Sequence, residues 1–289
     1  MPIKRKLVKI NTPEGQPGFL GPGHIARPII SGPFSDSDPF IMLMDDMLDK
    51  KDNEPVGGPH PHAGFETVSL LLEGEMGDEV HKMKGGDFQL MTAGSGIVHT
   101  ETIDKIAKMR LLQLWLNLPK KDRAAVPRLQ ELPSEHVPAL SENGVSIKLY
   151  SGTLAGLTSP VQNYSPIIVA DITLAAGTTS VQRIPANYNT FLYVLNGSLK
   201  VGAEEKQLHQ DQVGWLDLFE DADLSDLRLS TEEEARFILY AGKPTGENIV
   251  SHGPFIADSL EDIQRLYREY RQGAMKHIAE VPESQRILL

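Results

Sequence analysis

Short apolar runs separated by turn residues fill the chain from its start to about residue 255. Each run is rich in Val, Ile, Leu, Thr, Phe or Tyr and is bounded by Gly, Pro, Asn or Asp. Many short strands in this spacing are typical of a β-sandwich or β-barrel, so we predict an all-β fold. The clearest runs are residues 67–75, 87–94, 109–119, 145–156, 165–177, 190–202 and 235–244.

Helical periodicity is confined to one segment near the C-terminus, residues 259–279. Ser259 is an expected N-cap with Asp262 three residues later, a pattern that favours the start of a helix. Apolar and aromatic side chains then recur at helical spacing, at Ile263, Leu266, Tyr267 and Tyr270. One C-terminal helix is therefore predicted.

A polar segment with four of the 20 prolines, residues 119–144, separates two β-rich halves. Its composition is typical of a connector, so we place a domain boundary there, between residues 1–128 and 129–289. The two halves also resemble each other weakly, because residues 65–94 and 189–218 both contain an aliphatic strand, a glycine turn and a second strand.

Composition excludes some classes of function. The net charge is −11, from 28 Lys plus Arg and 39 Asp plus Glu, and this charge repels nucleic acids and anionic membranes. No cysteine is present, so a disulfide framework, a cysteine zinc site and a catalytic thiol are all excluded. No apolar segment is long enough for a signal peptide core or a membrane span. We expect a soluble cytoplasmic protein, with a nuclear location as the alternative in a eukaryote because of the basic residues 4–6.

Two short polar pairs carry the candidate chemistry. His60 and His62 stand one residue apart before an apolar run, and His99 and Glu101 repeat this spacing 37 residues after His62. Side chains at i and i+2 of a strand point to the same face, so each pair can serve one target. Two neighbouring strands would then form a four-ligand metal site from His60, His62, His99 and Glu101.

Other residues offer competing interpretations. Glu66 shares strand parity with His62 and is the alternative carboxylate ligand, although a role beside the ligands suits it equally. Trp115 is expected in the core, with the wall of the pocket as the alternative. The remaining histidines lack an i+2 partner in strand context and are expected to be structural or exposed: His24, His81, His136, His209, His252 and His277.

Three imidazoles and one carboxylate suit a borderline divalent metal, and Fe(II) is the preferred candidate. Mn(II), Ni(II), Cu(II) and Zn(II) remain alternatives. Four protein ligands on a six-coordinate metal leave two positions for small molecules, whereas Zn(II) more naturally takes four ligands. The second half lacks corresponding histidines, so the site is expected in the first half alone.

Five stretches together resemble the pirin family of the cupin superfamily. The resemblance extends over nearly the whole chain, and the second and third stretches are the most specific in combination. The stretches are SGPFSDSDPFIMLMDDM (31–47), PHPHAGFETVSLLLEGE (59–75), GGDFQLMTAGSGIVHTE (85–101), LLQLWLNLP (111–119) and SHGPFIADSLEDIQRLYREYRQG (251–273).

This resemblance implies a bicupin, with two stacked antiparallel β-barrels of jelly-roll type and a metal in the N-terminal barrel only. It also implies that His60, His62, His99 and Glu101 bind iron. Several members of the family are quercetin 2,3-dioxygenases, and others are regulators that bind a transcription factor or a metabolic enzyme. The chain departs from many relatives in the hairpin at residues 76–84, which is shorter and borders the expected pocket mouth.

We therefore predict a metal-dependent dioxygenase that cleaves a small aromatic, flavonol-like enol with O₂. Glu101 is the expected general base, because it is the only carboxylate in the ligand set. The alternative is a metal-bearing, redox-responsive regulator with a protein partner. An open apolar cavity above the metal would favour the enzyme, and a closed site would favour the regulator.

Overall fold

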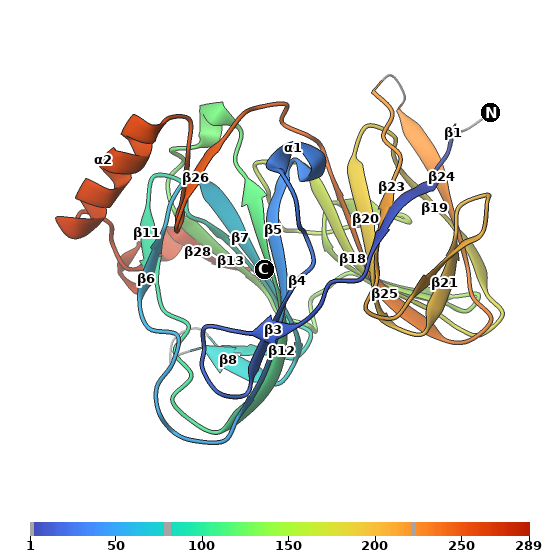
Figure 1. Cartoon of the computed structure of the whole chain (residues 1–289), viewed down its shortest axis with the longest axis horizontal. Helices are drawn as coiled ribbons and strands as arrows, with labels where there is room; N and C mark the ends of the chain where they lie inside the picture. The colour runs from blue at the N-terminus through green and yellow to red at the C-terminus, as the bar shows by residue number, and fades with distance from the viewer. Residues whose placement is uncertain (1–2, 78–81, 221–222) are drawn as a thin grey trace. The chain divides into compact units, whose positions relative to one another are not determined.

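The computed structural model describes residues 3–77, 82–220 and 223–289 (Figure 1). The chain divides into two compact units: unit 1 comprises residues 1–13 and 137–244, and unit 2 comprises residues 14–136 and 245–289. These units differ from the expected consecutive division at residues 128 and 129. The N-terminal segment belongs to unit 1, which contains most of the second half of the sequence, because β2 (Leu7–Asn11) pairs there with β23 (Val213–Leu216). The C-terminal segment belongs to unit 2, which contains most of the first half, and packs there.

Unit 1 is built from two large sheets of mostly antiparallel strands. The first sheet has the order β14 (Ala139–Glu142), β15 (Val145–Ser151), β18 (Ile167–Leu174), β25 (Ala235–Gly242), β20 (Asn189–Asn196), β23, β2. The second has the order β1 (Ile3–Lys4), β24 (Leu224–Ser230), β21 (Ser198–Val201), β22 (Lys206–His209), with β19 (Thr179–Pro185) also paired to β24. A small hairpin of β16 (Thr153–Leu154) and β17 (Leu157–Thr158) completes the unit.

Alternation along these strands fills the interior of unit 1 with aliphatic side chains. Every second residue of β18 and β25 belongs to one buried cluster, as the two-residue period of a strand requires. Strands of the second sheet contribute Leu199, Leu227 and Leu229 to the same cluster. Unit 1 therefore has a continuous apolar core between its sheets.

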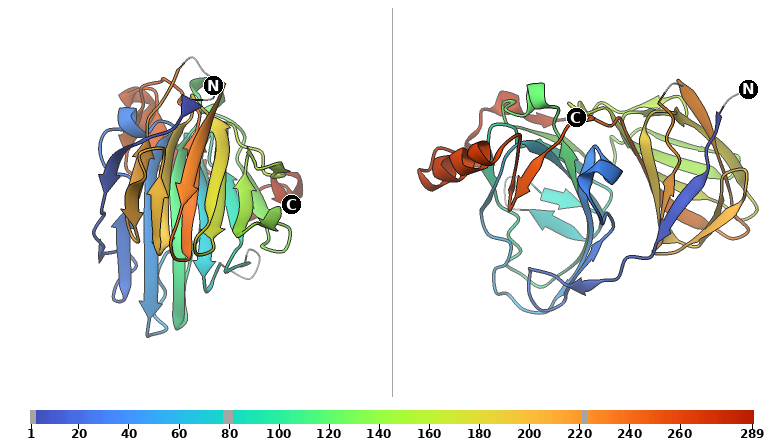
Figure 2. Two further views of the ribbon diagram at one scale, coloured as in Figure 1. Left: turned by 90° about the vertical axis from the view of Figure 1, so that its right-hand side faces the viewer. Right: turned by 45° about the horizontal axis from the view of Figure 1, so that its top comes forward.

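In its described residues, unit 2 has one large sheet and three small strand pairs. The large sheet has the order β28 (Arg286–Leu288), β13 (Arg128–Leu132), β10 (Phe88–Thr92), β7 (Phe65–Glu73), β12 (Ala107–Asn117), β5 (Phe40–Lys50), β4 (His24–Pro28), β3 (Gln16–Pro17). The pairs are β6 (His60–His62) with β11 (Ile97–His99), β8 (Glu75–Gly77) with β9 (Lys82–Lys84), and β26 (Val250–His252) with β27 (Phe255–Ala257). Figure 2 shows the long strands β5, β12 and β7 side by side.

The C-terminal helix α2 (Leu260–Arg271) forms where its sequence signals predict it. The backbone N–H of Asp262 donates to Oγ of Ser259, which caps the first turn. Its buried side chains Ile263 and Leu266 belong to a cluster with Phe255 of β27. The helix ends earlier than the predicted segment, and Gly273 follows with a positive φ of 71°.

Short helical segments complete unit 2 among the described residues. They are α1 (Phe34–Ser37) and the 3₁₀ turns Lys120–Asp122, Ile278–Glu280 and Glu283–Gln285. Neither α-helix in the described part of the chain is long and apolar enough to span a membrane. The predicted all-β fold with a C-terminal helix is confirmed, in the form of jelly-roll sheets that do not close into complete barrels.

Candidate metal centre

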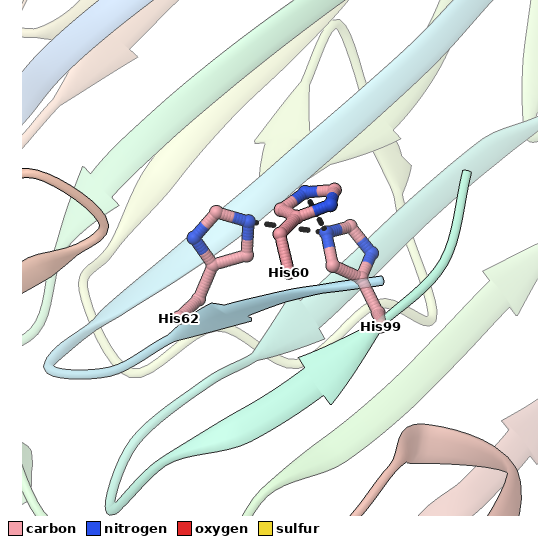
Figure 3. Close-up of side chains that lie close together, drawn as sticks. All are labelled: His60, His62 and His99. Atoms are coloured by element: carbon pink, nitrogen blue, oxygen red, sulfur yellow. Dashed lines mark hydrogen bonds between the residues drawn. The ribbon is translucent and has the colours of Figure 1, made fainter. Parts of the chain in front are cut away.

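Two short strands bring three histidines together in unit 2. His60 and His62 lie on β6 and point to the same side, and His99 lies on β11 directly opposite His60 (Figure 3). The antiparallel register also places Ile97 opposite His62. This is the strand pairing that the i, i+2 spacing predicts for the histidines.

The ring nitrogens of the three histidines converge on one point. Nε2 of His99 lies 3.0 Å from Nε2 of His62 and 2.8 Å from Nε2 of His60. Among the described residues, these three form the one group whose possible ligand atoms all lie within 4.8 Å of one another. Such a group has the size and donor type of a site for a divalent transition metal.

The hydrogen bonds around the rings support this interpretation. The carbonyl of Gly58 can only accept, so Nδ1–H of His60 donates to it over 2.9 Å. Neutral His60 therefore has its lone pair on Nε2, toward the other two rings. A single N–H on Nε2 of His99 cannot satisfy both neighbours at once, whereas a cation between the rings accepts all three lone pairs.

Burial keeps the rings of His62 and His99 neutral. Desolvation, together with the nearby His60, lowers the pKa of His62 to about 3, although the carbonyl of Pro254 opposes the shift. The pKa of His99 also falls well below its usual value, first through burial and then through the neighbouring histidines. Neutral imidazole is the form that binds a metal, so the site is prepared for one at neutral pH.

Glu101 lies near the histidines but outside the cluster of three. Burial raises the pKa of its carboxyl group, Asp46 raises it further, and His60 opposes the shift. The backbone of Glu101 is held by Gly57, whose carbonyl accepts from the Glu101 N–H at 3.2 Å. Gly57 has a φ of 75°, and a Cβ there would lie 2.3 Å from the carbonyl oxygen of Glu101, so only glycine fits.

The alternative carboxylate, Glu66, lies elsewhere. Strand parity between His62 and Glu66 assumes one continuous strand, but a turn at Gly64 separates β6 from β7. Glu66 is fully buried, and its Oε1 accepts from the hydroxyl of Thr92 at 2.8 Å. It does not line the cavity at the histidines, because the turn changes which face it occupies.

Two histidines that sequence reasoning set aside lie close to the site. Nε2 of His277 lies 2.8 Å from Oγ1 of Thr100, beside His99, and the proximity of His277 helps to lower the pKa of His99. His24 bonds Asp46, which lines the same cavity as the cluster. Neither shares a motif with the three histidines, so spacing alone gave no signal. The predicted exposure of His81 concerns a residue outside the described part of the chain.

A cavity of about 230 Å³ opens beside the histidines, and most of its wall is apolar. Trp115 lines it and lies against His62, with ring centroids 5.3 Å apart, so the pocket-wall interpretation of this residue holds. Phe19, whose side chain is 81 % exposed, lies at the rim. The other apolar lining residues are Leu20, Ala26, Met42, Met44, Met76, Ile103, Met109 and Leu111.

Comparison with known proteins identifies the family. The family models for pirin and for the pirin C-terminal cupin domain match residues 29–116 and 169–276. Pirin from Rattus norvegicus is 37% identical over 259 residues, which cover 87% of this chain and 87% of that protein. The chain belongs to the pirin family.

Two further similar proteins carry the name of an activity. A Pseudomonas aeruginosa protein, provisionally named quercetin 2,3-dioxygenase, is 34% identical over 289 residues, covering 94% of this chain and 98% of that protein. The crystal structure of a quercetin 2,3-dioxygenase from Acinetobacter baumannii superposes with a TM-score of 0.82 at 25% identity, covering 96% and 99% of the two chains. The resemblance to pirins inferred from the sequence is thus confirmed.

Proposed function

We propose that this pirin is a metal-dependent dioxygenase that cleaves a flavonol-like aromatic enol with O₂. The observation that carries the proposal is the convergence of three histidines beside an open, mostly apolar cavity. A closed site would suit a regulator, whereas a cavity with a few convergent polar groups suits a small-molecule ligand. The names of the two quercetin dioxygenase relatives support the same substrate class.

In this proposal His60, His62 and His99 bind the metal through Nε2, and Glu101 is the fourth ligand. Fe(II) is the preferred ion, with Mn(II), Ni(II), Cu(II) and Zn(II) as alternatives, because imidazole and carboxylate donors accept all of them. A bound cation would lower the pKa of a substrate hydroxyl and supply the redox chemistry for O₂.

The protein side chains then bind, orient and deprotonate the substrate. Trp115 and the methionines present an apolar surface to an aromatic ring and exclude water from it. Glu101 accepts the proton of the enol hydroxyl. Its pKa is raised toward neutral pH, and a general base is most effective when its pKa lies near the working pH. The carbonyl of Gly58 holds the ring of His60 in the tautomer that directs its lone pair to the metal.

The test is anaerobic reconstitution with Fe(II), quantitation of bound iron, and then measurement of O₂ uptake with quercetin. Wild type is expected to bind one iron and consume O₂, and His62→Ala is expected to lose both. Glu101→Gln should reduce turnover more than metal binding if Glu101 is the base. A variant that keeps its metal and full turnover would refute that role.

Stoichiometric iron without O₂ uptake in the wild type would instead favour the redox-responsive regulator. In that case the metal would serve a protein partner, and reduction or oxidation of the iron should change the affinity for that partner. Both results are read from the same reconstituted sample.

A further inference from the structure

Two acidic side chains line the cavity beside the histidines, Glu101 and Asp46. Asp46 lies on β5, at i+2 from Met44 and i+4 from Met42, so the three share the face that lines the cavity. Its side chain is 12 % exposed. Asp46 is therefore a carboxylate in an otherwise apolar stretch of the cavity wall.

His24 holds this carboxylate in a defined orientation. The backbone N–H of Leu20 donates to Nδ1 of His24 at 3.1 Å, so Nδ1 carries the lone pair and Nε2 carries the hydrogen. Nε2–H then donates to Oδ1 of Asp46 at 2.9 Å. The ring of His24 is fully buried and packs against Gly18, where a Cβ would lie 2.1 Å from Nδ1.

The second oxygen of Asp46 is left for a ligand. Within the described residues, Oδ1 bonds His24 and no side chain or backbone group bonds Oδ2. A carboxylate oxygen in an apolar wall gains free energy from any hydrogen-bond donor that enters the cavity. On the neighbouring strand β12, Gln113 also lines the cavity, and its Oε1 accepts a hydrogen bond from the hydroxyl of Ser69 at 3.1 Å.

We propose that Asp46 is a specificity-determining residue whose Oδ2 accepts a hydrogen bond from a second hydroxyl group of the aromatic ligand, with His24 as its positioning residue. The ligand class is then a polyhydroxylated aromatic enol in preference to an enol with no other hydroxyl. This inference rests on the proposed function, because it assumes that the enol end lies at the histidines.

The test compares two probes, quercetin and 3-hydroxyflavone, which has the enol hydroxyl but lacks the others. Affinities are measured without O₂ on Fe(II)-loaded protein, by quenching of tryptophan fluorescence and by calorimetry, so no turnover is needed. Wild type is expected to prefer quercetin by about tenfold or more, the usual effect of one hydrogen bond to a charged group.

Asp46→Asn should remove most of this preference. Nε2–H of His24 still requires an acceptor, so it keeps Oδ1 of the asparagine and the amide NH₂ then faces the cavity, where it cannot accept. The quercetin to 3-hydroxyflavone affinity ratio should fall by about tenfold. Met44→Leu, two residues along the same strand face, is the matched control and should change both affinities together.

Two variants at His24 test positioning separately from stability. His24→Gln retains a donor near the position of Nε2 and should keep the affinity ratio, whereas His24→Leu should lower it as Asp46→Asn does. A purely structural role would lower the melting temperature in both and leave the ratio unchanged. If Asp46→Asn does not fold, this pair makes the same comparison.

The outcomes separate the two proposals. If Asp46→Asn binds both probes with an unchanged ratio, the role of Asp46 is refuted and the proposed function stands. If wild type binds neither probe, the proposed function fails and the inference fails with it. A preference that is lost in Asp46→Asn and His24→Leu, and retained in His24→Gln and Met44→Leu, supports both.

Discussion

The two units of this pirin use the same strand order and fill their interiors differently. From β18 to β23 in unit 1 the order is β18, β25, β20, β23, and in unit 2 the corresponding strands are β5, β12, β7, β10. One row across three strands reads Ala170, Leu239, Leu192 in unit 1. The matching row in unit 2 reads Met44, Gln113, Ser69. Apolar residues in unit 1 are replaced by polar or flexible ones in unit 2.

The opposite side of each interior shows the same difference. In unit 1 a second sheet of five strands supplies side chains that meet this row and close the core. In unit 2 the short strand pairs stand opposite the large sheet, and β6 and β11 present histidines there. One jelly-roll plan therefore supports a packed core or a ligand cavity, and the side chains on a few rows decide which.

The largest expected effect comes from a substitution that creates a cavity in the packed core of unit 1. Phe237 is fully buried in the core of unit 1, so Phe237→Ala should lower the free energy of unfolding by about 3–5 kcal/mol, as cavities in close-packed cores do. Met44→Ala, on the wall of the existing cavity in unit 2, should cost about 1 kcal/mol or less. Urea unfolding measures both, and equal costs would contradict the contrast between the units.

Metal binding should stabilise the protein by a comparable amount. A ligand that binds only the folded state at about 1,000 times its dissociation constant adds about 4 kcal/mol. Wild type is therefore expected to melt at a higher temperature with Fe(II) than without it, in the absence of O₂. His62→Ala should lose this increase, and His209→Ala, which changes an exposed histidine of unit 1, should keep it. An increase that survives in His62→Ala would place the metal elsewhere.

Acid should destabilise the metal-free protein through the same histidines. The pKa of His62 is lowered to about 3 in the folded state, so between pH 6.5 and 3 the unfolded state binds the extra proton. Stability is thus fully present above pH 6.5 and is lost as the pH falls toward 3. One such ring contributes about 2–3 kcal/mol between pH 6.5 and 4.5.

The measurement is urea unfolding of chelator-treated protein at several pH values, for wild type and His62→Leu. The variant lacks one titrating ring, so its stability should fall less steeply over this range. Identical slopes would mean that the ring of His62 is protonated as easily in the folded state as in the unfolded chain. Unit 1 contains no comparable histidine cluster among its described residues, so the effect belongs to unit 2.

The strands and the three histidines could be predicted from the sequence because each depends on a local pattern. Alternation identified the strands, and the i, i+2 spacing placed His60 and His62 on one face of β6. The contact between Asp46 and His24 could not be predicted in this way, because the two residues lie on adjacent strands and share no sequence motif. The parity argument for Glu66 failed because it ignored the turn at Gly64.

The smallest expected effect concerns two neighbouring glycines of unit 2, Gly57 and Gly58, which lie before the first histidine of the cluster. Gly57 has a positive φ and no space for a Cβ beside the carbonyl of Glu101, whereas Gly58 has nothing within 4 Å of a Cβ. Gly57→Ala should cost about 1–2 kcal/mol of stability and weaken Fe(II) binding, because it displaces the backbone that carries Glu101. Gly58→Ala should stay within about 0.5 kcal/mol and bind iron normally. If Gly57→Ala loses stability but binds iron as wild type does, the position of Glu101 is not needed for the metal, and three histidines suffice to hold it.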